Sequence, residues 1–255
     1  MSFIELDGVA KTFQVDDGEI QALLSVSLRI EQGEFVSLVG PSGCGKSTLL
    51  RILAGLISAT GGDVRVAGEP VRAPRSDVGI VFQSAVLLPW RTVIDNVMLP
   101  VDVAGEPRDA YRTRVEQLLR LAGLAGFGDR LPGQLSGGMQ QRVAICRALV
   151  RAPKILLMDE PFGSLDAITR EEMGIELLRI WSEVGATVLF ITHGIPEAVF
   201  LSDRVAVMTR RPGRIEEVLE IGLPRPRGLE TFQHARFTEA AGRIRTAIEG
   251  AHARP

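Results

Sequence analysis

The pattern of apolar and polar positions predicts a chain in which strands and helices alternate. Apolar and polar residues alternate from Leu24 to Ile30, which is the period of a strand with one buried face. Phe3–Leu6 and Asp63–Val66 have a similar character. Together the three segments predict an antiparallel sheet early in the chain.

Three apolar runs without alternation, at residues 35–40, 155–159 and 187–192, predict central parallel strands that are covered on both faces. Apolar residues spaced by three and four positions predict two amphipathic helices. The first set is Met173, Leu177, Ile180, Trp181 and Val184, and the second is Tyr111, Val115, Leu118, Leu119 and Ala122. The first helix is expected to pack on the sheet.

The order of these segments predicts the domain organisation. Residues 1–224 would form the main domain, with a helical subdomain at about 84–150 inserted between two central strands. Residues 225–255 are rich in Pro and Arg before a helical pattern at about 238–248. We expect this last segment to be a loosely attached helical appendage.

Composition narrows the class of protein. The chain has 255 residues, of which 45% are hydrophobic and 24% charged, and this is ordinary for a globular protein with a sizeable core. A formal net charge of −2 gives no reason to expect nucleic acid, and the basic run at 210–214 is interpreted as a solvated turn. Two cysteines make a structural disulfide improbable and indicate a reducing compartment.

Location follows from what the sequence lacks. The start, MSFIELDG, has no apolar signal core, and no run of about 18 apolar residues occurs. We therefore expect a cytoplasmic protein, for which any role at a membrane would require a partner.

Residues Gly40 to Thr48, GPSGCGKST, fit the phosphate-binding pattern G-x-x-x-x-G-K-[ST]. The pattern follows an apolar run and precedes a helical sequence, and a phosphate-binding loop requires this order of strand, loop and helix. Glycines let backbone N–H groups surround phosphates, Lys46 supplies a positive charge, and the Ser47 hydroxyl can bind Mg²⁺. The alternative is an incidental glycine turn.

Asp159 and Glu160 end the apolar run ILLMDE. At the carboxyl edge of a parallel sheet, two adjacent carboxylates can take two different roles, metal binding and general-base catalysis. Asp159 would hold Mg²⁺, and Glu160 would act as general base on the attacking water. A surface acidic pair at a strand end is the alternative.

GPSGCGKST, LSGGMQQR, ILLMDEP and GSLDA occur in the order and approximate spacing of the ATP-binding cassette (ABC) ATPases, which the chain resembles over about residues 1–215. The resemblance implies an α/β P-loop NTPase fold with a mostly parallel central sheet, an N-terminal antiparallel β subdomain and an inserted helical subdomain. It also implies hydrolysis of ATP to ADP and phosphate, with Mg²⁺ as cofactor.

The turn in LSGGMQQR, residues Leu135 to Arg142, is the most specific of these motifs. In the family, the Ser-Gly-Gly turn of one subunit closes over the γ-phosphate bound by another, in a head-to-tail homodimer that holds two ATP molecules. Ser136 and Gly138 would then serve the partner's ATP. A helix start after two glycines offers free amides to an anion, whereas without the family the turn would be a plain loop.

Further roles follow from the resemblance alone. Gln83 matches the glutamine that contacts Mg²⁺ and water, and Phe13 matches the aromatic residue that stacks on adenine, usually Tyr. Asp166 matches the loop that communicates across the dimer. His193 matches the switch histidine at the γ-phosphate, although Gly194 stands where the family usually has Asp.

The site residues can be collected by role. The catalytic residues expected are Lys46, Gln83, Glu160 and His193, and the metal-binding residues are Ser47, Gln83 and Asp159. The ATP-binding residues expected are Phe13, Gly40, Pro41, Ser42, Gly43, Cys44, Gly45, Lys46, Ser47, Thr48, Gln83, Ser136, Gly138 and Asp166. Loop amides and Lys46 could lower the pKa of the Cys44 thiol, and an inert buried thiol is the alternative.

A lone cassette of this length resembles the separate ATPase subunit of a bacterial transporter, on the inner face of the membrane. Leu87–Trp90 matches the place where a permease helix docks, with ordinary core packing as the alternative. This stretch and TRRPGRI at 209–215 resemble the ATPases of nitrate, sulfonate and taurine importers. The family implies an extracytoplasmic solute-binding protein as an indirect partner.

Two other classes remain as alternatives. A soluble ABC ATPase of DNA repair or translation would need a coiled-coil insertion, tandem cassettes or a basic surface, and none is visible. A non-catalytic regulatory module is disfavoured because Lys46, Glu160 and His193 are all present.

Overall fold

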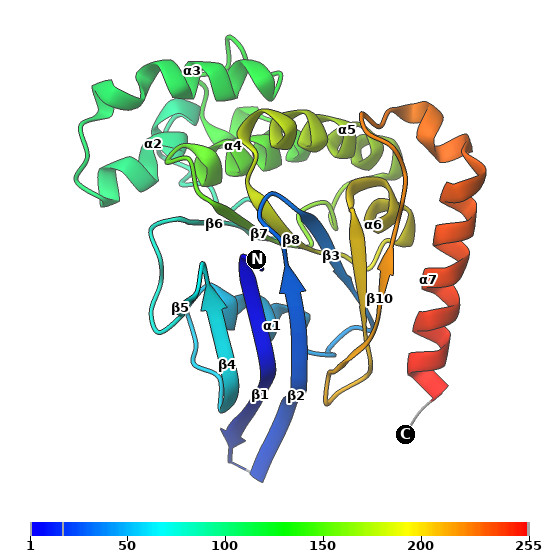
Figure 1. Cartoon of the computed structure of the whole chain (residues 1–255). Coiled ribbons are helices and arrows are strands. Elements are labelled where there is room, and N and C mark those ends of the chain that lie inside the picture. The colour runs from blue at the N-terminus through cyan, green and yellow to red at the C-terminus, as the bar shows by residue number, and fades with distance from the viewer. Residues whose placement is uncertain (1, 17, 254–255) are drawn as a thin grey trace. The chain divides into compact units, whose positions relative to one another are not determined.

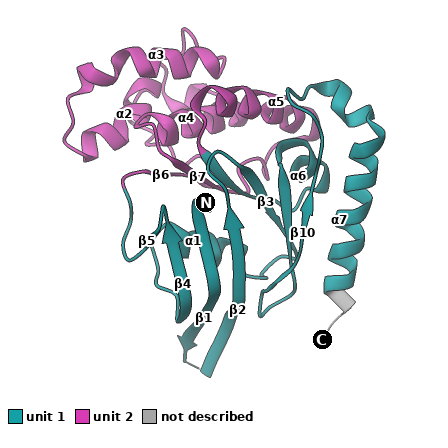
Figure 2. Cartoon of the chain, viewed as in Figure 1, with its two compact units in different colours: residues 1–75, 187–255 teal, residues 76–186 magenta. Residues whose placement is uncertain are grey.

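The computed structural model describes residues 2–16 and 18–253, and the chain divides into two compact units (Figure 2). Unit 1 contains residues 1–75 and 187–255, and unit 2 contains residues 76–186. The fold is α/β, with the helices and strands labelled in Figure 1.

An antiparallel sheet forms the first part of unit 1, as the alternation in the sequence predicts. Its strands are, in order, β2 (Gly18–Ile30), β1 (Ile4–Val15), β4 (Gly61–Val66) and β5 (Glu69–Pro70). Ile4 pairs with Ile30 of β2 and with Val66 of β4, and all three are fully buried. This register gathers apolar side chains on one face, and the predicted antiparallel subdomain is confirmed.

Parallel strands form the second part of unit 1. Strand β3 (Phe35–Val39) lies between β8 (Thr187–Ile191) and β9 (Arg204–Met208), and β10 (Ile215–Glu220) pairs antiparallel with β9. Every residue of β3 and β8 is buried, as expected for strands covered on both faces. Leu38 pairs with Ile191, so the chain leaves β3 and β8 at the same edge of the sheet.

Four helical segments complete unit 1. They are α1 (Lys46–Leu53), α6 (Ile195–Leu201), the 3₁₀ turn η3 (Leu229–Gln233) and α7 (Ala235–Ala253). Helix α7 packs against α6, β9 and β10.

The C-terminal segment is firmly held, so the prediction of loose attachment is wrong. Arg227 is 6% exposed, and its guanidinium donates hydrogen bonds to the carbonyl oxygens of Val199, Phe200 and Ser202 at the end of α6. The Phe232 ring stacks on Phe200 with centroids 4.7 Å apart. Burial lowers the pKa of Arg227 to about 10. Composition alone could not show this, because the carbonyl partners lie more than 20 residues away.

Unit 2 combines a parallel strand pair with helices. Strands β6 (Val78–Val81) and β7 (Ile155–Asp159) pair with Val81 opposite Met158. The helices are α2 (Val93–Val103), α3 (Arg112–Leu121), α4 (Gly137–Leu149) and α5 (Ala167–Val184), with 3₁₀ turns η1 (Arg108–Tyr111) and η2 (Pro132–Gln134). Helices α3 and α5 bury most of the apolar positions from which the periodicity predicted them, but Trp181 and Val184 are half-buried and Tyr111 lies in η1.

Candidate active site

The glycine loop connects β3 to α1 in unit 1. Gly40, Gly43 and Gly45 have φ angles of 158°, 75° and 106°, a region that L side chains rarely adopt. A Cβ at Gly45 would lie 2.6 Å from Leu23 Cδ2, and one at Gly40 would lie 2.8 Å from the Met208 carbonyl oxygen. Both glycines are therefore required by space as well as by conformation.

Lys46 begins α1, and its side chain folds back into this loop. The residue is 6% exposed, and Nζ donates to the carbonyl oxygens of Gly40 at 2.9 Å and Pro41 at 3.0 Å. Of the described residues, none forms an ion pair with this ammonium. The loop thus holds a positive charge among neutral dipoles, ready for an anion. Ser47 and Thr48 follow in the first turn, half-buried.

The pKa of the Cys44 thiol differs from the one that the sequence predicted. It is 1% exposed, and burial raises the pKa of its thiol, while the nearby Lys46 charge acts in the opposite direction and more weakly. The expectation of a lowered pKa is wrong, because desolvation outweighs the Lys46 charge. The alternative of a buried thiol that stays protonated is the one that the structure supports.

His193 follows β8 at the same sheet edge as the glycine loop, and its side chain is exposed. The adjacent residues are held firmly. The Gly194 N–H donates to Thr192 Oγ1 at 2.9 Å, and the Thr192 hydroxyl donates to the Glu197 carboxylate. Gly194 caps α6 without a side-chain bond. Thr192 and Glu197 therefore fix the backbone around His193 although no Asp follows it.

Phe13 lies near the end of β1, also in unit 1, and is 37% exposed. The Lys11 ammonium lies 5.0 Å from the centroid of its ring. A cation near an exposed ring is attracted to the electron-rich face and limits its motion. The ring is thus presented at the surface, as a stacking platform requires.

In unit 2, Gln83 and Glu160 meet at the carboxyl ends of β6 and β7. Val81 and Met158 are partners, so Gln83 and Glu160 each follow two residues later. A Cβ on Gly163 would lie 3.2 Å from Gln83 Nε2 and 3.7 Å from Glu160 Oε2, so both side chains reach this glycine. Asp159 is the last residue of β7. The amide and the two carboxylates are therefore grouped at one edge.

Ser136 and Asp166 both cap helices of unit 2. Ser136 Oγ accepts from the Met139 N–H at 3.3 Å at the start of α4, and Asp166 Oδ1 accepts from the Thr169 N–H at 3.0 Å at the start of α5. The Thr169 hydroxyl also donates to Asp166 and holds the pKa of that carboxyl below its usual range. A Cβ at Gly138 would lie 3.2 Å from Thr169 Cγ2, so the two helix starts are adjacent.

The loop after Gln83 exposes apolar side chains. Trp90 is 73% exposed and Val86 60%, while Leu87 and Leu88 are half-buried. Ordinary core packing therefore does not describe Trp90. Of the helices in the described part of the chain, none has the length and apolar character needed to cross a membrane.

Two polar residues that the sequence analysis missed hold this loop. Buried Asn96 accepts from the Leu88 N–H at 2.8 Å, and its amide donates to the Leu88, Arg91 and Thr92 carbonyl oxygens. Arg147 donates to the carbonyl oxygens of Ala85 and Val86, and burial lowers its pKa. A lone Asn within the apolar helix VIDNV was the signal that could have pointed to Asn96.

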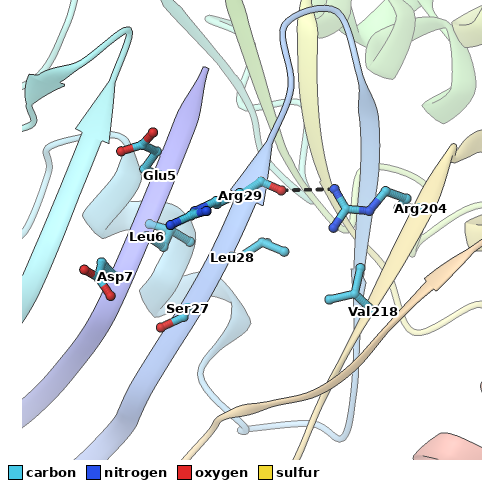
Figure 3. Close-up of a pocket in the computed structure, with 8 residues that line it drawn as sticks. All are labelled: Glu5, Leu6, Asp7, Ser27, Leu28, Arg29, Arg204 and Val218. Atoms are coloured by element: carbon cyan, nitrogen blue, oxygen red, sulfur yellow. Dashed lines mark hydrogen bonds between the residues drawn. The ribbon is translucent and has the colours of Figure 1, made fainter. Parts of the chain in front are cut away.

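A separate cavity of about 280 Å³ in unit 1 contains none of the predicted site residues (Figure 3). Its lining residues are Glu5, Leu6, Asp7, Ser27, Leu28, Arg29, Arg204 and Val218. Arg204 donates to the Arg29 carbonyl oxygen at 3.1 Å, as Figure 3 shows, and to Glu34 at 3.1 Å. The bond to the Arg29 carbonyl oxygen links β9 to β2 at this cavity.

Comparison with known proteins identifies the family of this chain. The family model described as ABC transporter matches residues 23–163. The chain is 42% identical over 253 residues to the aliphatic sulfonates import ATP-binding protein SsuB of Bacillus cereus, covering 96% of this chain and 99% of the relative. It is 48% identical over 231 residues to the nitrate import ATP-binding protein NrtD of Synechococcus elongatus, covering 89% of this chain and 84% of the relative.

Solved structures give the same result. The dimeric structure of MJ0796, a bacterial ABC transporter cassette, matches with a TM-score of 0.74 and 36% identity over 89% of this chain and 100% of that one. A post-hydrolysis state of the same cassette, bound to ADP and phosphate, matches equally well.

The chain therefore belongs to the ABC transporter family. It is an ABC ATPase with the P-loop fold, the ATP-binding subunit of a transporter, and it resembles the corresponding subunits of sulfonate and nitrate importers.

Proposed function

We propose that this subunit powers the uptake of a small anionic, sulfur-containing or nitrogen-containing solute through a separate membrane permease. The names of relatives at 42% and 48% identity, which import aliphatic sulfonates and nitrate, support this class. Sites in the permease and in an extracytoplasmic solute-binding protein would select the solute.

One observation supports the coupling to a permease: the loop that contains Leu87–Trp90 exposes Trp90 on a backbone held by side-chain hydrogen bonds. Asn96 and Arg147 hold its backbone, while Trp90 extends into solvent. An exposed aromatic residue on a fixed backbone loses little conformational freedom on binding, and such residues dominate protein interfaces. The loop would dock a short permease helix, placing the subunit at the inner face of the membrane.

Hydrolysis would use the residues that the family motifs identify. The glycine loop would bind the phosphates, and Lys46 would neutralise charge on the outer ones. Glu160 would take a proton from water as its oxygen attacks the γ-phosphorus, and ADP would leave. Gln83 would orient this water, and His193 would donate a hydrogen bond to the γ-phosphate. Phe13 would stack on adenine.

Mg²⁺ fits the donor set of the predicted site. Ser47, Gln83 and Asp159 offer hydroxyl, amide and carboxylate oxygens, which are the hard donors that Mg²⁺ prefers. When bound, the ion would offset charge on the phosphates.

A homodimer would complete each site. The exposed Ser136 turn presents the amides at the start of the 13-residue helix α4, and these would cover the γ-phosphate bound by the partner. Asp166, on the adjacent helix start, would contact the same interface. In this arrangement, residues 1–224 form the ATPase domain, with a helical subdomain at about 84–150, and 225–255 an appendage.

The function is tested by purifying the subunit with its permease and by growth of a deletion strain. We expect ATP turnover by the complex, and failure of the strain to grow on one sulfonate or nitrogen source at limiting concentration. Normal growth on all such sources would contradict the solute class. Absence of turnover in the intact complex would contradict the ATPase role and favour a regulatory module.

A further inference from the structure

The side chain of Gln141 joins helix α4 to the residue before Gln83. Gln141 lies in the second turn of α4 and is 3% exposed. Its Nε2 donates to the carbonyl oxygen of Phe82 at 3.0 Å. The bond is partly buried, and breaking it would leave the buried Gln141 amide unsatisfied, which is costly. We therefore expect the contact to persist while both elements are folded.

This hydrogen bond controls the backbone of Gln83. The Phe82 carbonyl lies in the same rigid peptide plane as the nitrogen and Cα of Gln83. Strand β6 ends at Val81, so the plane lies just beyond the strand. Further along α4, Arg147 donates to the Ala85 and Val86 carbonyl oxygens at 2.7 and 2.8 Å. Helix α4 thus holds the chain on both sides of Gln83.

The same helix begins at the Ser136 turn. Ser136 is its N-cap, and Gly137 and Gly138 are its first residues. Gln141 follows Gly138 by three residues, which is about 4.5 Å along a helix axis. One helical turn transmits a displacement with little deformation, so a shift of the Ser136 turn reaches the Phe82 carbonyl through Gln141.

We propose that Gln141 is a positioning residue that couples the two ATP sites of the homodimer. The inference rests on the proposed function, in which Gln83 acts on the ATP of its own chain and the Ser136 turn covers the ATP of the partner. When the partner's ATP draws in the Ser136 turn, α4 moves, and the Gln141 amide orients Gln83. Each site then hydrolyses ATP efficiently only when the other is filled.

The decisive variant is Gln141→Met, because methionine has a similar length and volume and lacks the N–H donor. It is tested in the full-length subunit assembled with its permease in vesicles. We expect ATP affinity, measured with a fluorescent analogue, to stay within about twofold of wild type. We expect kcat to fall about tenfold, roughly the effect of losing one hydrogen bond of 1.4 kcal/mol. The Hill coefficient for ATP should fall towards one.

The control is Val143→Ala, a buried position of the same helix that makes no bond to the Gln83 loop. It should lower Tm, because it removes buried apolar contacts, and keep the wild-type Hill coefficient. The variant Gln83→Ala separates the proposed role of Gln83 in hydrolysis from the inferred positioning role of Gln141. Normal turnover in Gln83→Ala overturns the role of Gln83, and the inference with it. Loss of turnover there, with normal kcat and cooperativity in Gln141→Met, overturns the inference alone.

A second measurement applies if Gln141→Met does not fold. Amide hydrogen exchange at residues 82–88 is compared in Glu160→Gln and in Glu160→Gln/Ser136→Arg, both saturated with ATP. Slower exchange in the first variant supports transmission from the Ser136 turn. Equal exchange in the two variants overturns it.

Discussion

Glu160 adopts a left-handed backbone conformation with φ of 48°, directly after the last residue of β7. For a residue with a Cβ this conformation costs on the order of 1–2 kcal/mol, and such strain concentrates at functional sites. The conformation accompanies a side chain that reaches Gly163 beside Gln83. The role of this carboxylate as general base is the prediction that motif order gives.

Replacing Glu160 by Gln should abolish hydrolysis and preserve ATP binding. The amide keeps the shape of the side chain and loses its basicity, and loss of a general base costs about 10² to 10⁴ in rate. The measurement is phosphate release at saturating ATP, with the exposed Glu171→Gln as control. Near-normal turnover in Glu160→Gln would remove this residue from the role of base.

Lys46→Ala should act at an earlier step, on nucleotide binding. The Lys46 ammonium is buried and bonded to the Gly40 and Pro41 carbonyl oxygens, so its removal leaves the loop without a cation for the phosphates. We expect Kd for ATP with Mg²⁺, measured by calorimetry, to rise at least about tenfold, since charged hydrogen bonds contribute about 1.5–3 kcal/mol. Exposed Lys154→Ala is the control, and equal affinities would count against the phosphate loop.

At the scale of elements, side chains rather than regular structure hold the Trp90 loop. The residues between β6 and α2 form no helix or strand. Their backbone groups bond instead to Asn96 of α2 and Arg147 of α4. A loop fixed in this way can present apolar residues to a partner without collapsing onto its own domain.

Asn96→Ala should therefore weaken both stability and assembly. The Leu88 N–H and the Arg91 carbonyl oxygen lose the Asn96 side chain as their partner, whereas the Leu88 and Thr92 carbonyl oxygens keep the backbone N–H groups of Arg91 and residue 96. We expect the free energy of unfolding to fall by about 1–3 kcal/mol. Chemical denaturation measures the first effect, and recovery of permease in co-purification the second. Val103→Ala, exposed in the same helix, should change neither. Unchanged recovery of permease in Asn96→Ala would separate this loop from docking.

At the scale of the whole molecule, the prediction is that a complete ATP site needs two chains. Ser136→Arg should block closure by bulk and leave its own glycine loop intact, whereas Lys46→Ala retains a normal Ser136 turn. In a mixed dimer, one site combines both substituted elements. The other site combines the unchanged glycine loop of the Ser136→Arg chain with the unchanged Ser136 turn of the Lys46→Ala chain. We expect partial recovery of phosphate release on mixing, reduced by the coupling inferred for Gln141. If each ATP site were contained within one chain, mixing would give no recovery of phosphate release, because every chain would carry its own defect.

Complete coupling would also prevent recovery, so dimerisation is measured separately. Glu160→Gln should dimerise when saturated with ATP, as seen by light scattering. A monomer that persists with ATP and with the permease present would contradict the shared site.

The sequence predicted well those features that consecutive residues define. The buried runs at β3 and β8 and the helix after the glycine loop needed only local periodicity, and the glycines and Lys46 are within seven positions of one another. The spacing of motifs was likewise sufficient to indicate the family, which the comparisons show. The roles of the individual site residues remain predictions.

What the sequence by itself determined is the class of protein and the identity of its candidate chemical groups, because these depend on residue type and order. The tertiary structure decided the protonation of Cys44, the attachment of the C-terminal segment by Arg227 and the contact of Gln141 with Phe82. Phe82 and Gln141 are 59 positions apart. Burial and hydrogen-bond partners of this kind arise only when distant segments pack together, so no local pattern in the chain records them.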